Sequence, residues 1–167
     1  TPVIALTIKL DSPGPVFFKQ QRAGREGKPF NLYKFRSMTA DAEDELDSLI
    51  DWDNLQEPQF KLQDDPRLTR VGRILRRWSL DELPQFWNTL KGEMSLVGPR
   101  PESLRFVARY DAWQRRRLMA KPGITGPMQI NGRGKLSLND RVKLEVHYIQ
   151  NYSVKTDCII LARTIPA

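Results

Sequence analysis

One stretch, residues 76–101, constrains this chain more than any other. It has the sequence RRWSLDELPQFWNTLKGEMSLVGPRP, in which the adjacent carboxylates Asp81 and Glu82 lie between two arginines and an apolar segment. Two acids at a helix start, with guanidinium groups close in sequence, suit a site that handles a metal ion and a phosphate. Pairs of this kind are more often simple helix caps, so the rest of the stretch decides between the two interpretations.

The start of the helix in this stretch has two alternatives. Ser79 and Glu82 fit a capping box, or Asp81 is the N-cap and Pro84 lies in the first turn, where its missing N–H is tolerated. We favour the second, because under the first Pro84 would fall after the turn with free donors. In both cases the carboxylates lie at the positive end of the helix dipole, which favours their ionised forms. A stripe of apolar residues is then expected to be buried: Leu83, Phe86, Trp87 and Leu90.

The end of the stretch, SLVGPRP, holds Arg100 between two prolines. Each proline ring fixes its own φ and restricts the residue before it, so the backbone here is stiff and extended. An arginine held in this way loses less entropy on binding a phosphate than a free one. The alternative is a proline-rich loop with a solvated arginine.

The charge of the chain narrows the class of partner. A net charge of +7 and a pI near 9.8 imply an anionic partner, which could be nucleic acid, a membrane surface or a phosphorylated substrate. Residues 39–65 carry ten acids and one base, whereas residues 66–121 carry thirteen bases and five acids. A DNA-binding face would rarely place so acidic a segment beside a basic one, whereas a site facing phosphates could.

The periodicity predicts an α+β fold, mainly helical, in a single domain of residues 1–167 with an N-terminal β-hairpin and short strands. Segments 16–22 and 29–36 flank the turn sequence Gly24–Gly27, which indicates the hairpin. Besides the helix that begins near Asp81, helices are expected at four places, with a short strand at 128–133 and a glycine-dependent loop at 121–126. The helical segments are 39–50, 67–77, 102–119 and 137–152.

Two single residues give little support to other kinds of site. His147 is the only histidine and is expected to be structural, so no Ser-His-Asp set is available for hydrolysis. Cys158 is the only cysteine, which excludes an internal disulfide, and its apolar surroundings predict burial. The chain has no zinc-binding pattern.

Four short motifs follow one another along the chain. They are KFRSM at 34–38, SLDELPQ at 79–85, GEMSLVGPRP at 92–101 and KPGITG at 121–126. In this order, and over nearly the whole chain from Leu10 to about Ile165, they resemble the bacterial sugar transferases. These are the monotopic polyprenyl-phosphate hexose-1-phosphate transferases, also called phosphoglycosyl transferases.

The resemblance implies an activity and a site. The activity is transfer of a hexose-1-phosphate from a UDP-sugar to polyprenyl (undecaprenyl) phosphate with release of UMP, the first membrane step of surface polysaccharide or glycoconjugate assembly. Asp81 would be the nucleophile that carries the phosphosugar, and Glu82 would bind the cofactor Mg²⁺. Contacts to the substrate phosphates are expected from Lys34, Arg36, Arg76, Arg100 and Arg133. Arg77 is a near competitor of Arg76.

The resemblance also implies a place at the membrane. Thr1–Leu10 is apolar but far shorter than the ~20 residues of a membrane-spanning helix. The family has a membrane-inserted re-entrant helix upstream of its catalytic domain. We therefore expect a membrane-surface-associated catalytic fragment of a longer protein at the cytoplasmic face of the bacterial inner membrane. Arg115–Arg117 would face its anionic headgroups.

One position departs from the family pattern, and one other class of function competes with the enzyme. Family members commonly carry an aromatic or bulky apolar residue around Pro127 and Met128, so the sugar-nucleotide preference stays open. The rival is a basic nucleic-acid or anionic-lipid binding module without turnover. Such a module explains the net charge but gives no role to adjacent acids within a basic region. We therefore predict an enzyme with no nucleic-acid partner.

Overall fold

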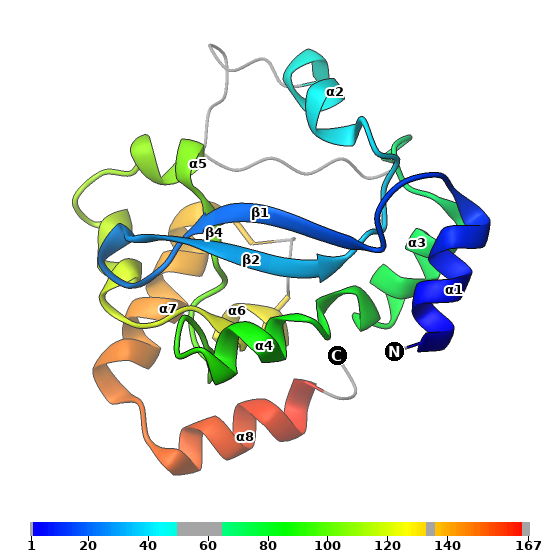
Figure 1. Ribbon diagram of the computed structural model, residues 1–167. Helices are drawn as coiled ribbons and strands as arrows, with labels where there is room; N and C mark the ends of the chain where they lie inside the picture. The colour runs from blue at the N-terminus through cyan, green and yellow to red at the C-terminus, as the bar shows by residue number, and fades with distance from the viewer. Residues whose placement is uncertain (1, 50–64, 133–135, 165–167) are drawn as a thin grey trace. The chain divides into compact units, whose positions relative to one another are not determined.

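A computed structural model describes residues 2–49, 65–132 and 136–164 (Figure 1). Helices and short strands are mixed along these residues, which confirms the mixed helix-and-strand prediction. The chain divides into two compact units. The first contains the described residues of Thr1–Gln20, Leu32–Gln56 and Phe60–Gln85, and the second those of Gln21–Asn31 and Phe86–Ala167. None of the helices in the described ranges has the length and apolar character that crossing a membrane requires.

The first unit is built around three helices and the base of the hairpin. Its helices are α1 (Pro2–Asp11), α2 (Ala42–Leu49) and α3 (Arg70–Arg77). Its core contains Ile8, Phe35 and Leu75, one each from α1, the hairpin and α3. The last residue of α1 also supports the start of α3, because the carboxylate of Asp11 accepts a hydrogen bond from the backbone N–H of Val71 at 2.9 Å.

The predicted hairpin is confirmed. Strands β1 (Phe17–Ala23) and β2 (Pro29–Phe35) are joined through a short 3₁₀ turn, η1 (Arg25–Gly27). The short strand β4 (Glu102–Ser103) adds to β1, so the order in this sheet is β2-β1-β4. The β1–β4 pairing is antiparallel, with Arg22 opposite Ser103. The tip of the hairpin belongs to the second unit and its base to the first.

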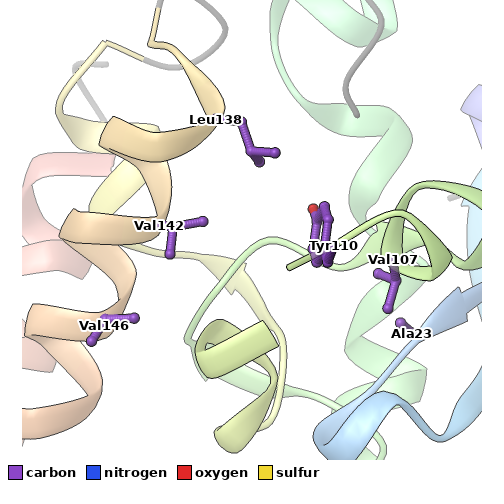
Figure 2. Packing of buried hydrophobic residues seen from close by; sticks show 6 residues of the cluster. All are labelled: Ala23, Val107, Tyr110, Leu138, Val142 and Val146. Carbon is purple, nitrogen blue, oxygen red and sulfur yellow. The ribbon is translucent and has the colours of Figure 1, made fainter. Parts of the chain in front are cut away.

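The core of the second unit contains one face of helix α7 (Leu138–Asn151). Figure 2 shows Leu138, Val142 and Val146 on one face of α7, together with Tyr110 and Val107 of the same buried cluster. Their spacing of four residues is that of one helix face. The other elements are α4 (Gln85–Leu90), which begins with the last residue of the first unit, and β3 (Ser95–Val97), α5 (Leu104–Ala108), η3 (Gln114–Met119), β5 (Gly123–Thr125), α6 (Pro127–Ile130) and α8 (Val154–Thr164).

Strands β3 and β5 pair in parallel, and three glycines allow their backbones to approach closely. A Cβ atom on Gly123 would lie 2.1 Å from the backbone nitrogen of Gly98, and one on Gly126 would lie 2.0 Å from the Gly98 carbonyl oxygen. No side chain fits in such gaps. The predicted dependence of residues 121–126 on glycine is therefore confirmed, although the segment contains a strand.

The predicted buried stripe is wrong for its three members on α4, whereas Leu83, which precedes α4, is partly buried and packs against the core of the first unit. Phe86, Trp87 and Leu90 are 49%, 57% and 79% exposed, whereas Asn88 is fully buried. The Asn88 amide donates to the backbone carbonyl of Asn31 and to the carboxylate of Glu93, both at 2.7 Å. These two hydrogen bonds fix the polar face of the short helix inward, so apolar spacing does not decide its orientation.

Three other local predictions need correction. Residues 102–119 form β4, α5 and η3 instead of one helix, and Arg117 within the expected exposed arginine triplet is buried. Residues 127–130 form helix α6 where a strand was expected. Cys158 is exposed, because it lies two residues before the buried Ile160 on α8 and two residues rotate a helix by about 200°. The other three predicted helices are confirmed as α2, α3 and α7.

Candidate active site

The two adjacent carboxylates lie in a 3₁₀ turn, η2 (Leu80–Glu82), directly after α3. Ser79 adopts a left-handed conformation, with φ 54° and ψ 22°, which ends α3 abruptly. The turn is closed by the Glu82 N–H, which donates to the Ser79 carbonyl at 3.2 Å. Both capping alternatives are wrong, because the Ser79 side chain makes no cap and the next helix begins only after Pro84.

Asp81 and Glu82 differ in exposure although they are neighbours. Asp81 is buried, with 5% of its surface exposed. The Glu82 side chain is 15% exposed and its Oε1 lies 3.1 Å from Nζ of Lys34, whose side chain is 20% exposed. Lys34 comes from β2. The structure thus brings three of the predicted site residues together in the first unit, in surroundings that exclude most water and strengthen their electrostatic interactions.

Arg76 lies on the last turn of α3 and is held by Ser37. Its Nε donates to Oγ of Ser37 at 3.0 Å. Gly72 permits this contact, because a Cβ atom there would lie only 1.9 Å from the Ser37 carbonyl oxygen. That same carbonyl accepts from the backbone N–H of Thr69, whose side chain caps α3. The close packing of α3 on Ser37 fixes the backbone from which Arg76 extends, while its side chain stays exposed.

Arg36 is placed differently from the expectation. It is buried and donates to Ser12 Oγ and Pro15 O, both at 2.6 Å, and to Ser12 O at 2.8 Å. Binding a phosphate would require these hydrogen bonds to break. Arg36 lies just after the end of β2 at Phe35, so strand alternation does not set the direction of its side chain. The geometry therefore favours a structural role for Arg36, which clamps the turn between α1 and β1.

The last two predicted phosphate contacts lie elsewhere. Arg100 belongs to the second unit, where its backbone N–H donates to Oε1 of Glu145 at 3.1 Å and its carbonyl accepts from Nη2 of Arg117 at 3.0 Å. Arg133 lies outside the residues that the structure describes.

A buried charged cluster around Arg117 was missed by the sequence reasoning. Arg117 and Glu145 are 1% and 0% exposed, and Glu102 and Arg141 complete the cluster with Arg22. One signal could have revealed it: Glu145 lies three residues after Val142 and seven after Leu138, on the face of α7 that is otherwise apolar.

The pKa values of this cluster show that its charges support one another. Burial lowers the pKa of the Arg117 guanidinium, but Glu145, Tyr110 and Glu102 outweigh burial and raise it above its usual value. Burial raises the pKa of the Glu102 carboxyl, but Arg117, Arg141 and Arg22 outweigh it and hold that pKa below its usual value. Burial raises the pKa of Tyr110 to about 12, against the opposing effect of Arg117. Glu102 and Arg117 are therefore both ionised at neutral pH.

The donor set at residues 81 and 82 suits Mg²⁺. This ion takes one or two carboxylates from a protein and leaves its other positions to water and phosphate oxygens. Glu82, the predicted ligand, can supply one such carboxylate. No cluster of three or more His, Cys, Asp or Glu residues occurs within the described ranges, so a closed, all-protein metal site is absent from them.

Comparison with known proteins shows the family to which the chain belongs. The whole chain, residues 1–167, matches the family described as bacterial sugar transferase. Galactosyl transferase CpsE of Streptococcus agalactiae serotype III (strain NEM316) is 47% identical over 153 residues, which cover 91% of this chain and 34% of that protein. Undecaprenyl-phosphate galactose phosphotransferase of Salmonella typhimurium is 45% identical, over 90% of this chain and 33% of that protein.

A third relative is covered over most of its length. The uncharacterized sugar transferase EpsL of Bacillus subtilis (strain 168) is 48% identical over 158 residues, which are 95% of this chain and 72% of that protein. The chain thus spans about a third of the length of the first two relatives and most of the third.

Proposed function

Because the chain belongs to the bacterial sugar transferase family, we propose that it transfers a hexose-1-phosphate from a UDP-sugar to polyprenyl phosphate and releases UMP. The name of the Salmonella relative supports a polyprenyl phosphate acceptor, and the names of two relatives support galactose as the sugar. The observation that carries the proposal is the buried Asp81 beside Glu82, with Lys34 bound to Glu82.

The reaction proceeds in two displacement steps at the sugar-linked phosphorus. A carboxylate oxygen of Asp81 attacks this phosphorus, the bond to the bridging oxygen breaks, and UMP leaves with the bonding electron pair. The phosphosugar is then carried on Asp81 as an acyl phosphate, a kind of intermediate that aspartate forms in other phosphoryl transfers. A phosphate oxygen of the polyprenyl phosphate attacks in the second step, which frees Asp81 and yields a polyprenyl diphosphate hexose.

Cationic side chains balance the charge of the phosphates. Lys34 and Arg76 are held by Glu82 and Ser37 in the first unit, and Arg100 has a fixed backbone in the second. Positioned charges of this kind stabilise phosphoryl transfer more than any covalent chemistry of the protein. Arg133 remains a candidate for the same role. Mg²⁺, held by Glu82 and by phosphate oxygens, would neutralise charge on the diphosphate when bound.

We place the reaction at the cytoplasmic face of the inner membrane, as the first membrane step of surface polysaccharide assembly. An acceptor with a polyprenyl chain is retained in a lipid bilayer. Helix α1 supports an interfacial position, because Val3, Leu6 and Leu10 are 72%, 61% and 79% exposed and follow helical spacing along one side of it. The rival binding module gains no comparable support, since it leaves Asp81 and Glu82 without a role.

Release of UMP from UDP-sugars without any lipid acceptor tests the proposal. The purified protein should release about one UMP per active site from its preferred UDP-sugar, and Asp81→Asn should release none. The matched control is Asp44→Asn, which neutralises an exposed aspartate on α2 and should leave release unchanged. Release by Asp81→Asn at the parental rate would refute the role of Asp81. No release from any UDP-hexose by the parent protein, even with polyprenyl phosphate added, would refute the function.

A further inference from the structure

The segment from Gly98 to Pro101 is bound to its surroundings at every backbone N–H it possesses. The Gly98 N–H donates to the Thr125 carbonyl at 2.9 Å, and the Arg100 N–H donates to Oε1 of Glu145 at 3.1 Å. Pro99 and Pro101 have no N–H. The carbonyl of Pro99 accepts from the Gly123 N–H at 2.8 Å. The segment is therefore far more constrained than its two prolines alone require.

Arg100 is held from both ends of its own backbone by one buried ion pair. Glu145 accepts its N–H, and Arg117 donates to its carbonyl at 3.0 Å. Nη2 of Arg117 donates a hydrogen bond to Oε1 of Glu145 at 2.9 Å, and Nε lies 2.6 Å from Oε2 as an ion-pair contact without hydrogen-bond geometry. The Nη2–Oε1 hydrogen bond closes a ring of hydrogen bonds through the Arg100 N–H and carbonyl, which fixes the direction in which the Arg100 side chain leaves the backbone.

Stability alone does not account for such a pair. Buried ion pairs contribute little net stability compared with apolar residues of similar volume, and their best-attested advantage is to define a single arrangement. Arg117 also donates to the hydroxyl of Tyr110 at 2.7 Å, so its guanidinium is oriented on a third side. Together these contacts hold the Arg117–Glu145 pair in one geometry. The pair in turn holds the backbone of Arg100 in place.

We propose that Arg117 and Glu145 are positioning residues, whose buried ion pair fixes the backbone of Arg100 so that its guanidinium is presented to a phosphate of the substrates. This inference rests on the proposed function for its phosphate ligand. Arg117 and Glu145 act through Arg100 and touch no substrate themselves. Disturbing the pair should act on turnover through Arg100 alone.

A double-mutant cycle on UMP release tests the coupling. Glu145→Gln should lower kcat/KM by roughly 10- to 100-fold, the scale expected when a binding group is misplaced by about 1 Å. In an Arg100→Ala background the same substitution should lower it by less than about threefold, because there is no longer a side chain to misplace. The matched control is Glu102→Gln, which neutralises a carboxylate of the same cluster but keeps Glu145 as the acceptor of the Arg100 N–H, and should act equally in both backgrounds.

Equal losses from Glu145→Gln in both backgrounds would overturn the proposal, since a purely structural residue acts independently of Arg100. If Glu145→Gln does not fold, Arg117→Lys keeps the charge, loses the Nη2 group that binds both Glu145 and the Arg100 carbonyl, and should give the same coupling. Hydrogen exchange of the Arg100 amide provides a readout without turnover: Glu145→Gln should accelerate it at least tenfold over parent and Glu102→Gln. An unchanged exchange rate of the Arg100 amide would overturn the positioning role, even in a protein that releases no UMP. Accelerated exchange in a protein that releases no UMP would refute only the proposed function.

Discussion

Substitution of Lys34 by methionine tests the electrostatic arrangement around Glu82. The Lys34 ammonium lies 3.1 Å from Glu82, and the side chains are only 20% and 15% exposed. Methionine keeps the length and apolar contacts of lysine but leaves the Glu82 carboxylate without this partner. A hydrogen bond to a charged group contributes about 1.5–3 kcal/mol, so the free energy of unfolding should fall by that amount. For a chain of this length the melting temperature should fall by roughly 3–12 °C.

Turnover should fall more steeply than stability. If Lys34 also neutralises phosphate charge in the transition state, its removal should lower kcat by ~10²-fold, as for other preorganised cationic or hydrogen-bonding groups. The assay measures UMP release at saturating UDP-sugar, beside a thermal melt. Lys19→Met is the matched control, because Lys19 is exposed on the neighbouring strand β1. Equal melting temperatures and equal kcat for the two methionine variants would refute the assignment of Lys34.

Three further predictions concern separate parts of the chain. Gly72→Ala should lower the free energy of unfolding by about 1–3 kcal/mol in a denaturant titration, because its Cβ would lie 1.9 Å from the Ser37 carbonyl; an unchanged midpoint would contradict the close packing of α3. The pKa of Glu102 is depressed in the folded protein, so its stabilisation is present above the ordinary value of 4.5 and is lost as pH falls through the folded value. The stability gap between parent and Glu102→Gln should therefore narrow below pH 4.5, and a gap that widened there would contradict the assigned direction. Glu82→Gln should raise the Mg²⁺ concentration needed for half-maximal UMP release, whereas an unchanged requirement would contradict its role as metal ligand.

The hairpin and the long helices could be predicted from the sequence because local signals specify them. Alternation and glycine mark the hairpin, and the apolar spacing of α7 matches its buried face, with Ser137 accepting from the Asp140 N–H as a local cap. These features depend on residues that are close in sequence, so they could be predicted without knowledge of any distant contact.

The short elements could not be predicted, because contacts far apart in the sequence decide them. Helix α4 turns Asn88 inward to reach Asn31, 57 residues away, and exposes its apolar side. Arg117 appeared in the sequence as one of three exposed arginines, but its partner Glu145 lies 28 residues further on. Spacing within a short segment carries no information about such partners.

In the candidate site, too, contacts between distant residues could not be predicted from local sequence signals. The pairing of Lys34 with Glu82 joins two motifs 48 residues apart and follows from the resemblance rather than from any local signal. The phosphate contact expected of Arg36 also came from the resemblance, whereas the structure shows its side chain bound to Ser12. Ser79, whose left-handed conformation shapes the turn that carries both acids, had no signal in its residue type.

The central claim is that Asp81 forms a covalent bond to the phosphorus of the transferred group. The most direct test incubates the protein with its UDP-sugar and Mg²⁺, without polyprenyl phosphate, then quenches in acid and maps the adduct by peptide mass spectrometry. The account predicts one hexose phosphate on Asp81, which disappears when polyprenyl phosphate is added before the quench. UMP release in the burst phase with an unmodified Asp81 peptide, or an adduct on another residue, would contradict it.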